Sequence, residues 1–194
     1  MSPLLPGIIA SGISGHLTPA DTGAMFPLQV VTVGAAGASD ITFTNIPSTY
    51  SHLQIRGIAR SSFATINGGF AIRLNSDTGN NYTVHILYGN GASAAAAAVT
   101  SDTSSTVAEI AGANASSNVF SASVIDILDY TNTNKYKTIR SLSGVDTNGS
   151  GQLRFGSGLW QNTNAVTSVT LLDYNGGTLQ QYSQFALYGI KGAA

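Results

Sequence analysis

The chain has 194 residues, which is enough for one all-β domain with its own hydrophobic core. Charged residues make up only 9% of the chain, against about 25% in typical soluble domains, while hydrophobic residues reach 43%. This composition excludes a disordered chain and indicates a surface that faces other protein copies more than free water. The net charge of −1 gives no basis for binding nucleic acid, and the lack of Cys excludes disulfides and thiolate metal sites. No apolar run approaches the roughly 20 residues of a membrane span.

Residues 1–27 differ from the rest of the chain, because Pro and Gly recur too often for a regular element. The same segment carries apolar side chains that are costly to leave in water, namely Leu4, Leu5, Ile8, Ile9 and Ile13. We predict an extended arm that docks these side chains on another subunit or a larger particle. The alternative is a disordered tail. Residues 28–194 are predicted to form the folded domain.

From residue 28 onward, short runs that alternate between apolar and polar residues predict β-strands separated by turns. In the run 51–60, Leu53 and Ile55 are expected on one face and Gln54 on the other. The run 119–130 is partly apolar on both faces, which predicts a central strand. The other predicted strands span 29–33, 40–45, 69–75, 82–88, 106–111, 135–144, 153–161, 165–174 and 183–190.

Two segments between these strands carry specific expectations. Residues 89–105 are predicted to form a surface loop, in which the run Ala94–Ala98 could make one helical turn. The segment 175–178 reads Asn-Gly-Gly-Thr and predicts a hairpin between the last two strands. In the final strand, Phe185 and Leu187 are expected to be buried, and the strand is expected in the interior of a sheet. With eleven short strands and no convincing helix, the sequence predicts an all-β, jelly-roll-like β-sandwich with an extended N-terminal arm.

Few residues are candidates for chemistry. His16, His52 and His85 each stand alone in the sequence, and His52 and His85, at polar-side strand positions, are expected to be solvated or hydrogen-bonded. Asp126 and Asp129 lie three residues apart, so on a strand they point to opposite faces and do not form an acid–base pair. We expect a strand-end hydrogen bond for Asp129 and a hydrogen-bonded position between two sheets for Asp126. The sequence thus predicts no catalytic residues.

Two further features could bind a ligand. The segment 77–81 reads Asp-Thr-Gly-Asn-Asn, which is expected to form an Asx-turn instead of a calcium site, because an EF-hand needs more acids and a terminal Glu. Trp160, the only Trp, stands beside amide side chains and is the candidate glycan contact; the alternative is a core or interface anchor. No cofactor or metal is expected.

Several motifs resemble a family of tailed-bacteriophage structural proteins, and together they cover most of the chain. The motifs are 3–11, 52–57, 74–82, 125–127 with Tyr130, 135–138, 157–160 and 185–191. Members of this family are called minor tail, tail-fibre-like or head-surface proteins.

The resemblance implies a component of the virion. Together with the low charge, the many small residues and the apolar N-terminal arm, it favours a non-enzymatic protein that is exposed on the particle and docks through this arm. A compact domain without a coiled-coil segment favours a capsid decoration or head-fibre role over a tail role. The implied partners are the major capsid or tail proteins and further copies of the chain, with a homotrimer as one option. The alternative is a minor tail or tail-fibre protein that binds a receptor or a host cell-wall glycan. Neither nucleic acid nor a membrane is expected as a partner.

Overall fold

The structure, a computed structural model, describes residues 24–192, which form twelve β-strands and no helix. These residues therefore include no helix that is long and apolar enough to cross a membrane. The strands are β1 (Met25–Thr32), β2 (Asp40–Phe43), β3 (His52–Ala59), β4 (Asn67–Leu74), β5 (Tyr82–Gly89), β6 (Ala94–Asp102), β7 (Ser105–Ala111), β8 (Ser121–Leu128), β9 (Lys137–Asp146), β10 (Gly151–Trp160), β11 (Val169–Asp173) and β12 (Gln184–Ile190).

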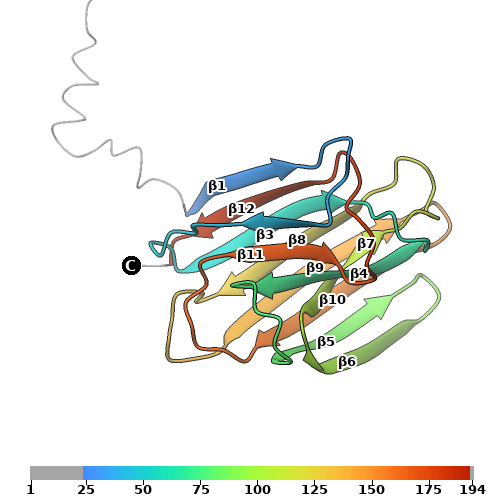
Figure 1. The fold of residues 1–194 in the computed structure, drawn as a ribbon. Helices are drawn as coiled ribbons and strands as arrows, with labels where there is room; N and C mark the ends of the chain where they lie inside the picture. Colours follow the sequence, from blue (N-terminus) through green and yellow to red (C-terminus); the bar gives the residue numbers. More distant parts are fainter. Residues whose placement is uncertain (1–23, 193–194) are drawn as a thin grey trace, which may run out of the picture.

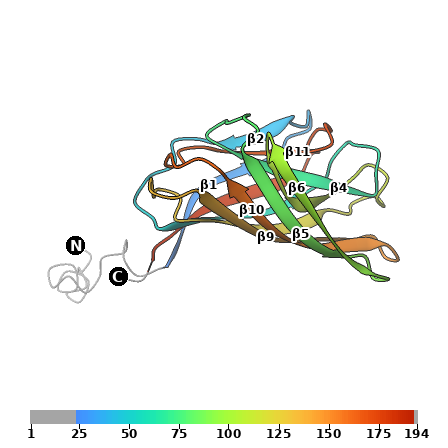
Figure 2. The same ribbon diagram turned by 90° about the horizontal axis from the view of Figure 1, so that it is seen from below.

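Two antiparallel sheets pack together as a β-sandwich, which confirms the predicted fold class (Figures 1 and 2). The large sheet has eight strands in the order β1-β12-β3-β8-β9-β10-β5-β6. The small sheet has four strands in the order β2-β11-β4-β7. From β1 to β5 each successive strand lies in the other sheet. The chain changes sheet again on both sides of β7 and on both sides of β11. The hairpins β5–β6 and β9–β10 lengthen the large sheet beyond β8.

The hydrophobic core lies between the two sheets. Alternation along β3 and β12 turns Leu53, Ile55, Phe185 and Leu187 inward, and all four are fully buried. The ring of Phe185 stacks on the ring of Phe70 from β4, with centroids 5.5 Å apart, and so joins the two sheets. Burying each such side chain stabilises the fold by about 1.5–3 kcal/mol. The predicted inward faces of both strands are confirmed.

The predicted sheet positions of two strands are also confirmed. β8 lies between β3 and β9 near the middle of the large sheet, as expected from its apolar run. β12 lies between β1 and β3, so the last strand has a neighbour on each side.

The predicted hairpin between the last two strands is wrong, because β11 belongs to the small sheet and β12 to the large one. A turn does form: the backbone N–H of Gly176 donates to the carbonyl of Asp173 at 3.3 Å, and Gly176 has a φ of 85°. Turn chemistry fixes the local backbone but not the sheet that the chain enters next. Here the chain crosses over, and β12 pairs with β1 and β3.

The loop predicted for residues 89–105 is also wrong. The run Ala94–Ala98 lies in β6, paired with β5 in a regular register from Ala94 opposite Gly89 to Val99 opposite Val84. Five alanines are too few for a stable isolated helix, so pairing with β5 overrides the helical preference of Ala.

β7 is an edge strand of the small sheet, yet all seven of its residues are buried. It lies close over β10 of the large sheet. A Cβ on Gly156 would stand 2.6 Å from the carbonyl oxygen of Val107, and a Cβ on Gly158 would stand 2.4 Å from Oγ of Ser105. The two glycines of β10 therefore permit this close approach.

The boundary of the predicted arm needs a correction. β1 begins at Met25, so residues 25–27 pair with β12, with Met25 opposite Ile190 and Phe26 opposite Gly189. The earlier part of the predicted arm lies outside the described residues; it includes Leu4, Leu5, Ile8, Ile9 and Ile13.

Candidate functional site

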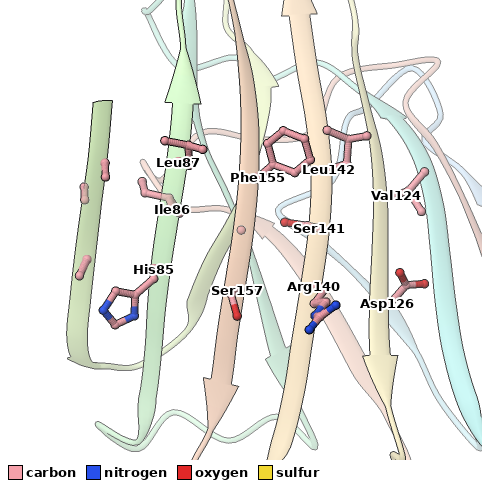
Figure 3. A pocket seen from close by; sticks show the side chains of 14 residues that line it. His85, Ile86, Leu87, Val124, Asp126, Arg140, Ser141, Leu142, Phe155 and Ser157 are labelled. Carbon is pink, nitrogen blue, oxygen red and sulfur yellow. The ribbon is translucent and has the colours of Figure 1, made fainter. Parts of the chain in front are cut away.

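The outer face of the large sheet, turned away from the small sheet, carries a line of apolar side chains across five strands. The cross-strand register places them opposite one another in the order Val124, Leu142, Phe155, Leu87 and Ala96. We call these five residues the apolar row. Leu142, Phe155 and Leu87 expose 44%, 51% and 53% of their surface. Figure 3 shows the larger side chains next to one another.

The apolar row results from an inverted polarity in β9 and β10. In β9, Leu142 faces outward, while Ser141 and Ser143 on either side are buried. In β10, Phe155 faces outward, while Arg154 is buried. The inward polar groups are needed there because they hydrogen-bond to β7. The sequence reading missed this arrangement, since an apolar residue between polar neighbours normally indicates the buried face.

A second line of side chains runs beside the apolar row. It consists of Asp126, Arg140, Ser157 and His85, opposite one another in that order, and we call it the polar row. Oδ1 of Asp126 accepts a hydrogen bond of 2.8 Å from Nε2 of Gln54. Asp126 therefore faces outward, and its predicted place between the sheets is wrong. The reason is that its neighbours in β8, both isoleucines, take the inward positions.

The two rows line an open groove of about 950 Å³ across β8, β9, β10, β5 and β6 (Figure 3). One side of the groove is apolar and the other carries an acid, a base, a hydroxyl and an imidazole. Such a surface can bury apolar groups of a partner while a few polar groups fix the orientation.

Trp160 is not part of this groove. It is 1% exposed, so its predicted role as a glycan contact is wrong, and the alternative of a core anchor is confirmed. Its ring stacks on Tyr82 with centroids 6.3 Å apart, and its Nε1 donates to Oδ2 of Asp77 at 2.8 Å. Burial raises the pKa of Tyr82 to about 12. Trp160 is buried because it lies on the same face of β10 as Arg154.

The loop that begins at Asp77 forms the predicted Asx-turn. Oδ1 of Asp77 accepts from the backbone N–H of Gly79, and Oδ2 accepts from Nδ2 of Asn81, each at 2.8 Å. The bond from Asn81, followed by that from Gly79, lowers the pKa of Asp77. The carboxylate is thus engaged in hydrogen bonds, and residues 24–192 contain no cluster of His, Cys, Asp or Glu that could hold a metal ion.

His52 and Asp129 meet where β8 ends. Nδ1 of His52 accepts from the backbone N–H of Asp129 at 2.9 Å and lies 3.4 Å from Oδ1 of the same residue. Asp129 also pairs with Lys135, whose hydrogen bond lowers the pKa of Asp129. The predicted strand-end role of Asp129 and the hydrogen-bonded state of His52 are confirmed. His85 is exposed in the polar row, and His16 lies outside the described residues.

A buried ion pair between the sheets was not anticipated from the sequence. Nη1 of Arg154 in β10 donates to Oε1 of Glu109 in β7 at 2.6 Å. Gln152 and Asn67 donate to the same carboxylate at 2.8 and 3.0 Å, and Nη2 of Arg154 donates to the carbonyl of Thr106 at 2.8 Å. The ion pair links the small sheet to the large sheet at the place where β7 lies over β10. Only the tertiary fold brings these distant residues together.

A buried lysine has a similar structural role. Nζ of Lys137, at the start of β9, donates to the carbonyls of Asn132, Lys135 and Thr163 at 2.6, 3.0 and 3.0 Å. Desolvation, followed by the charge of Lys135, lowers the pKa of Lys137. Its ammonium group ties two loops together.

The chain was compared with protein-family models and with curated proteins, and it matches none of them.

Proposed function

We propose that the chain is a non-enzymatic structural protein on the surface of a tailed-phage particle, and that it docks through the outer face of its large sheet. The docking role rests on the inverted polarity of β9 and β10, which turns Leu142 and Phe155 outward. Contiguous apolar patches on a protein surface mark interaction sites. The phage role is supported by the sequence motifs, such as the one at 185–191.

The charge pattern supports the same proposal. Only 9% of the residues are charged, so little repulsion opposes packing against other copies or against a shell. Asp126 and Arg140 stand opposite each other beside the apolar row and offer one charge of each sign to a partner. Charge complementarity of this kind sets the orientation of a docked partner more than its affinity.

We propose further that the sandwich is a jelly roll with two inserted hairpins. The support is the strand order β1-β12-β3-β8 in one sheet and β2-β11-β4-β7 in the other. The hairpins β5–β6 and β9–β10 are the additions, and they carry four of the five residues of the apolar row. Jelly rolls occur in capsid and lectin domains, which is an analogy at the level of the fold. The groove thus lies mainly on the two hairpins that are added to the eight strands of the jelly roll.

On the particle, we favour a capsid decoration or head-fibre position, with the major capsid protein as the partner, over a tail position. The described residues form one compact sandwich without a coiled-coil segment. Docking by the N-terminal arm remains a second proposal, which rests on the apolar residues of that segment.

Attachment to particles that lack the native copy tests the docking face. The change Phe155→Ser should weaken attachment by about tenfold or more, because a central apolar anchor is lost. The matched control is Tyr136→Ser. Tyr136 lies outside the groove, between β8 and β9, and its exposed fraction of 50% is nearly the same as the 51% of Phe155. Melting curves of both variants establish that the fold is kept. Equal attachment by the two variants would contradict the docking face.

A receptor- or glycan-binding module is the second candidate function. The observation that favours it is the position of Phe155 next to Arg140 and Ser157 in the groove, since a ring beside polar groups suits a sugar. A glycan array with the wild type and Arg140→Ala tests it. Binding that Arg140→Ala abolishes and Tyr136→Ser retains would favour this function over docking on the particle.

A further inference from the structure

Two of the four sheet edges are blocked against pairing with another strand by their own sequence. β1 contains Pro27, which has no backbone N–H, and its register with β12 shifts between Pro27 and Gln29. β2 is only four residues long and begins with the charged Asp40. Short length, Pro, charge and bulges are the usual means of protecting an edge.

A third edge, that of β7, is covered by side chains of the large sheet. The hydroxyl of Ser141 donates to the carbonyl of Val107, and Oγ of Ser143 accepts from the backbone N–H of Glu109 at 2.9 Å. Nη2 of Arg154 donates to the carbonyl of Thr106. These three backbone groups of β7 therefore have partners among the side chains of the large sheet.

The fourth edge, that of β6, has none of these protections over residues 94–99; its register with β5 shifts only beyond that stretch, between Val84 and Tyr82. β6 pairs with β5 on one side, and no strand formed by residues 24–192 lies beyond it (Figure 1). Its register is regular from Ala94 to Val99, and this stretch contains neither Pro nor a charged residue. The first charge is Asp102 at the far end, whose carboxylate accepts from the hydroxyl of Tyr174 at 2.9 Å.

The composition of β6 adds a second observation. Ala is depleted in strands because it offers little side-chain packing, and four of the five alanines in Ala94–Ala98 are exposed. An all-alanine edge strand therefore depends on backbone hydrogen bonds. A second strand on its free side would supply them, and small side chains would let that strand approach without a clash.

We propose that β6 pairs antiparallel with β6 of a second copy of the chain, about a two-fold axis at Ala96. In this register the run Ala94–Ala98 lies opposite itself, so every opposed pair is alanine on alanine. No like charges meet, because Asp102 lies beyond the paired run. The other edges offer a worse partner, since β1 carries Pro27 and β2 carries Asp40.

The pairing has a consequence for the outer face. Ala96 ends the apolar row, so the two-fold axis joins the rows of two copies into one line across ten strands. The two grooves then form a single surface. The proposal does not depend on the virion role, and it favours a two-fold pair over the homotrimer that the sequence analysis gave as one option.

A charge exchange at Ala96 tests the pairing on the full chain. Because Ala96 opposes itself, Ala96→Lys places two ammonium groups together, and Ala96→Asp places two carboxylates together. Each variant should raise the dissociation constant of the dimer by about tenfold or more. An equimolar mixture of the two variants should dimerise again. The control Ala122→Lys adds the same charge at another exposed alanine, on the outer face of β8, and should dimerise like the wild type.

Sedimentation equilibrium at concentrations up to about 100 µM gives the masses. A dimeric wild type, weakened single variants and a restored mixture are the expected results. A monomeric or trimeric wild type would overturn the proposal. So would a dimer that Ala96→Lys leaves intact, or a mixture that stays monomeric.

Discussion

Nε1 of Trp160 donates a hydrogen bond of 2.8 Å to Oδ2 of Asp77, and this contact joins the end of β10 to the turn between β4 and β5. Nδ2 of Asn81 donates to the same oxygen at 2.8 Å, one residue before β5 begins. Asp77 therefore positions the start of the β5–β6 hairpin, which supplies one side of the groove.

We expect acid to weaken the fold partly through Asp77. Its pKa is lowered below the ordinary value of 3.8, first by the hydrogen bond from Asn81, so folding favours the carboxylate. The stabilising contribution is then complete above the unfolded pKa and is lost as the pH falls through the folded pKa. Urea unfolding of the wild type and Asp77→Asn from about pH 6 to about pH 2 measures it. The difference in unfolding free energy should shrink as the pH falls; a constant difference would contradict this role.

The buried pair of Glu109 and Arg154 should behave differently from an exposed pair. Removing either partner alone, by Glu109→Met or Arg154→Met, leaves a buried charge unpaired and should cost about 3–5 kcal/mol. The double change should cost less than the sum of the two. Lys135→Met, which breaks the exposed pair with Asp129, should cost less than about 1 kcal/mol. Denaturant unfolding compares the four variants, and additive single changes would show that the buried pair is not coupled.

The register of β12 leads to a third prediction. Leu187 is fully buried, so Leu187→Ala should lower the unfolding free energy by about 2–5 kcal/mol. Gln184 is exposed and its amide donates to the hydroxyl of Thr32 at 2.9 Å, so Gln184→Ala should cost less than about 1.5 kcal/mol. Thermal or urea unfolding gives both values. If the two changes cost the same, the register is wrong.

Two deletions separate the predicted arm from β1. Removing residues 1–23 should leave the melting temperature nearly unchanged and reduce attachment to particles, if the apolar segment is a docking arm. Removing residues 1–26 also deletes Phe26, whose ring lies 5.7 Å from the ring of Tyr50 and below Nζ of Lys191 at 5.2 Å. That loss should lower the melting temperature by about 4 °C or more. Identical melting of the two deletions would contradict the role of Phe26 in the sandwich.

Much of the fold could be predicted from local alternation. The inward faces of β3 and β12 follow from Leu53, Ile55, Phe185 and Leu187, because a strand with one buried face repeats every two residues. The pairing of β6 could not be predicted, since Ala94–Ala98 shows no alternation. The sheet to which β12 belongs could not be predicted either, because turn residues do not specify which strands the following strand will pair with.

The candidate site could not be predicted from the sequence for a different reason. In β9, Leu142 between two serines has the pattern of a buried leucine, but the inward side of β9 faces the backbone of β7, which needs hydroxyl groups. A pattern along one strand does not reveal what lies opposite that strand. Trp160 shows the reverse case, since the amide side chains beside it suggested an exposed glycan contact, but its position on the inward face of β10 buries it.

The central claim is that the chain is part of a phage particle. Mass spectrometry that quantifies the proteins of phage particles, purified from a lysate of cells that carry the gene for the chain, tests it most directly. We predict that the chain is present in a fixed ratio to the major capsid protein and stays with the particles through purification. Its absence from purified particles, while it is abundant in the lysate of infected cells, would contradict the claim.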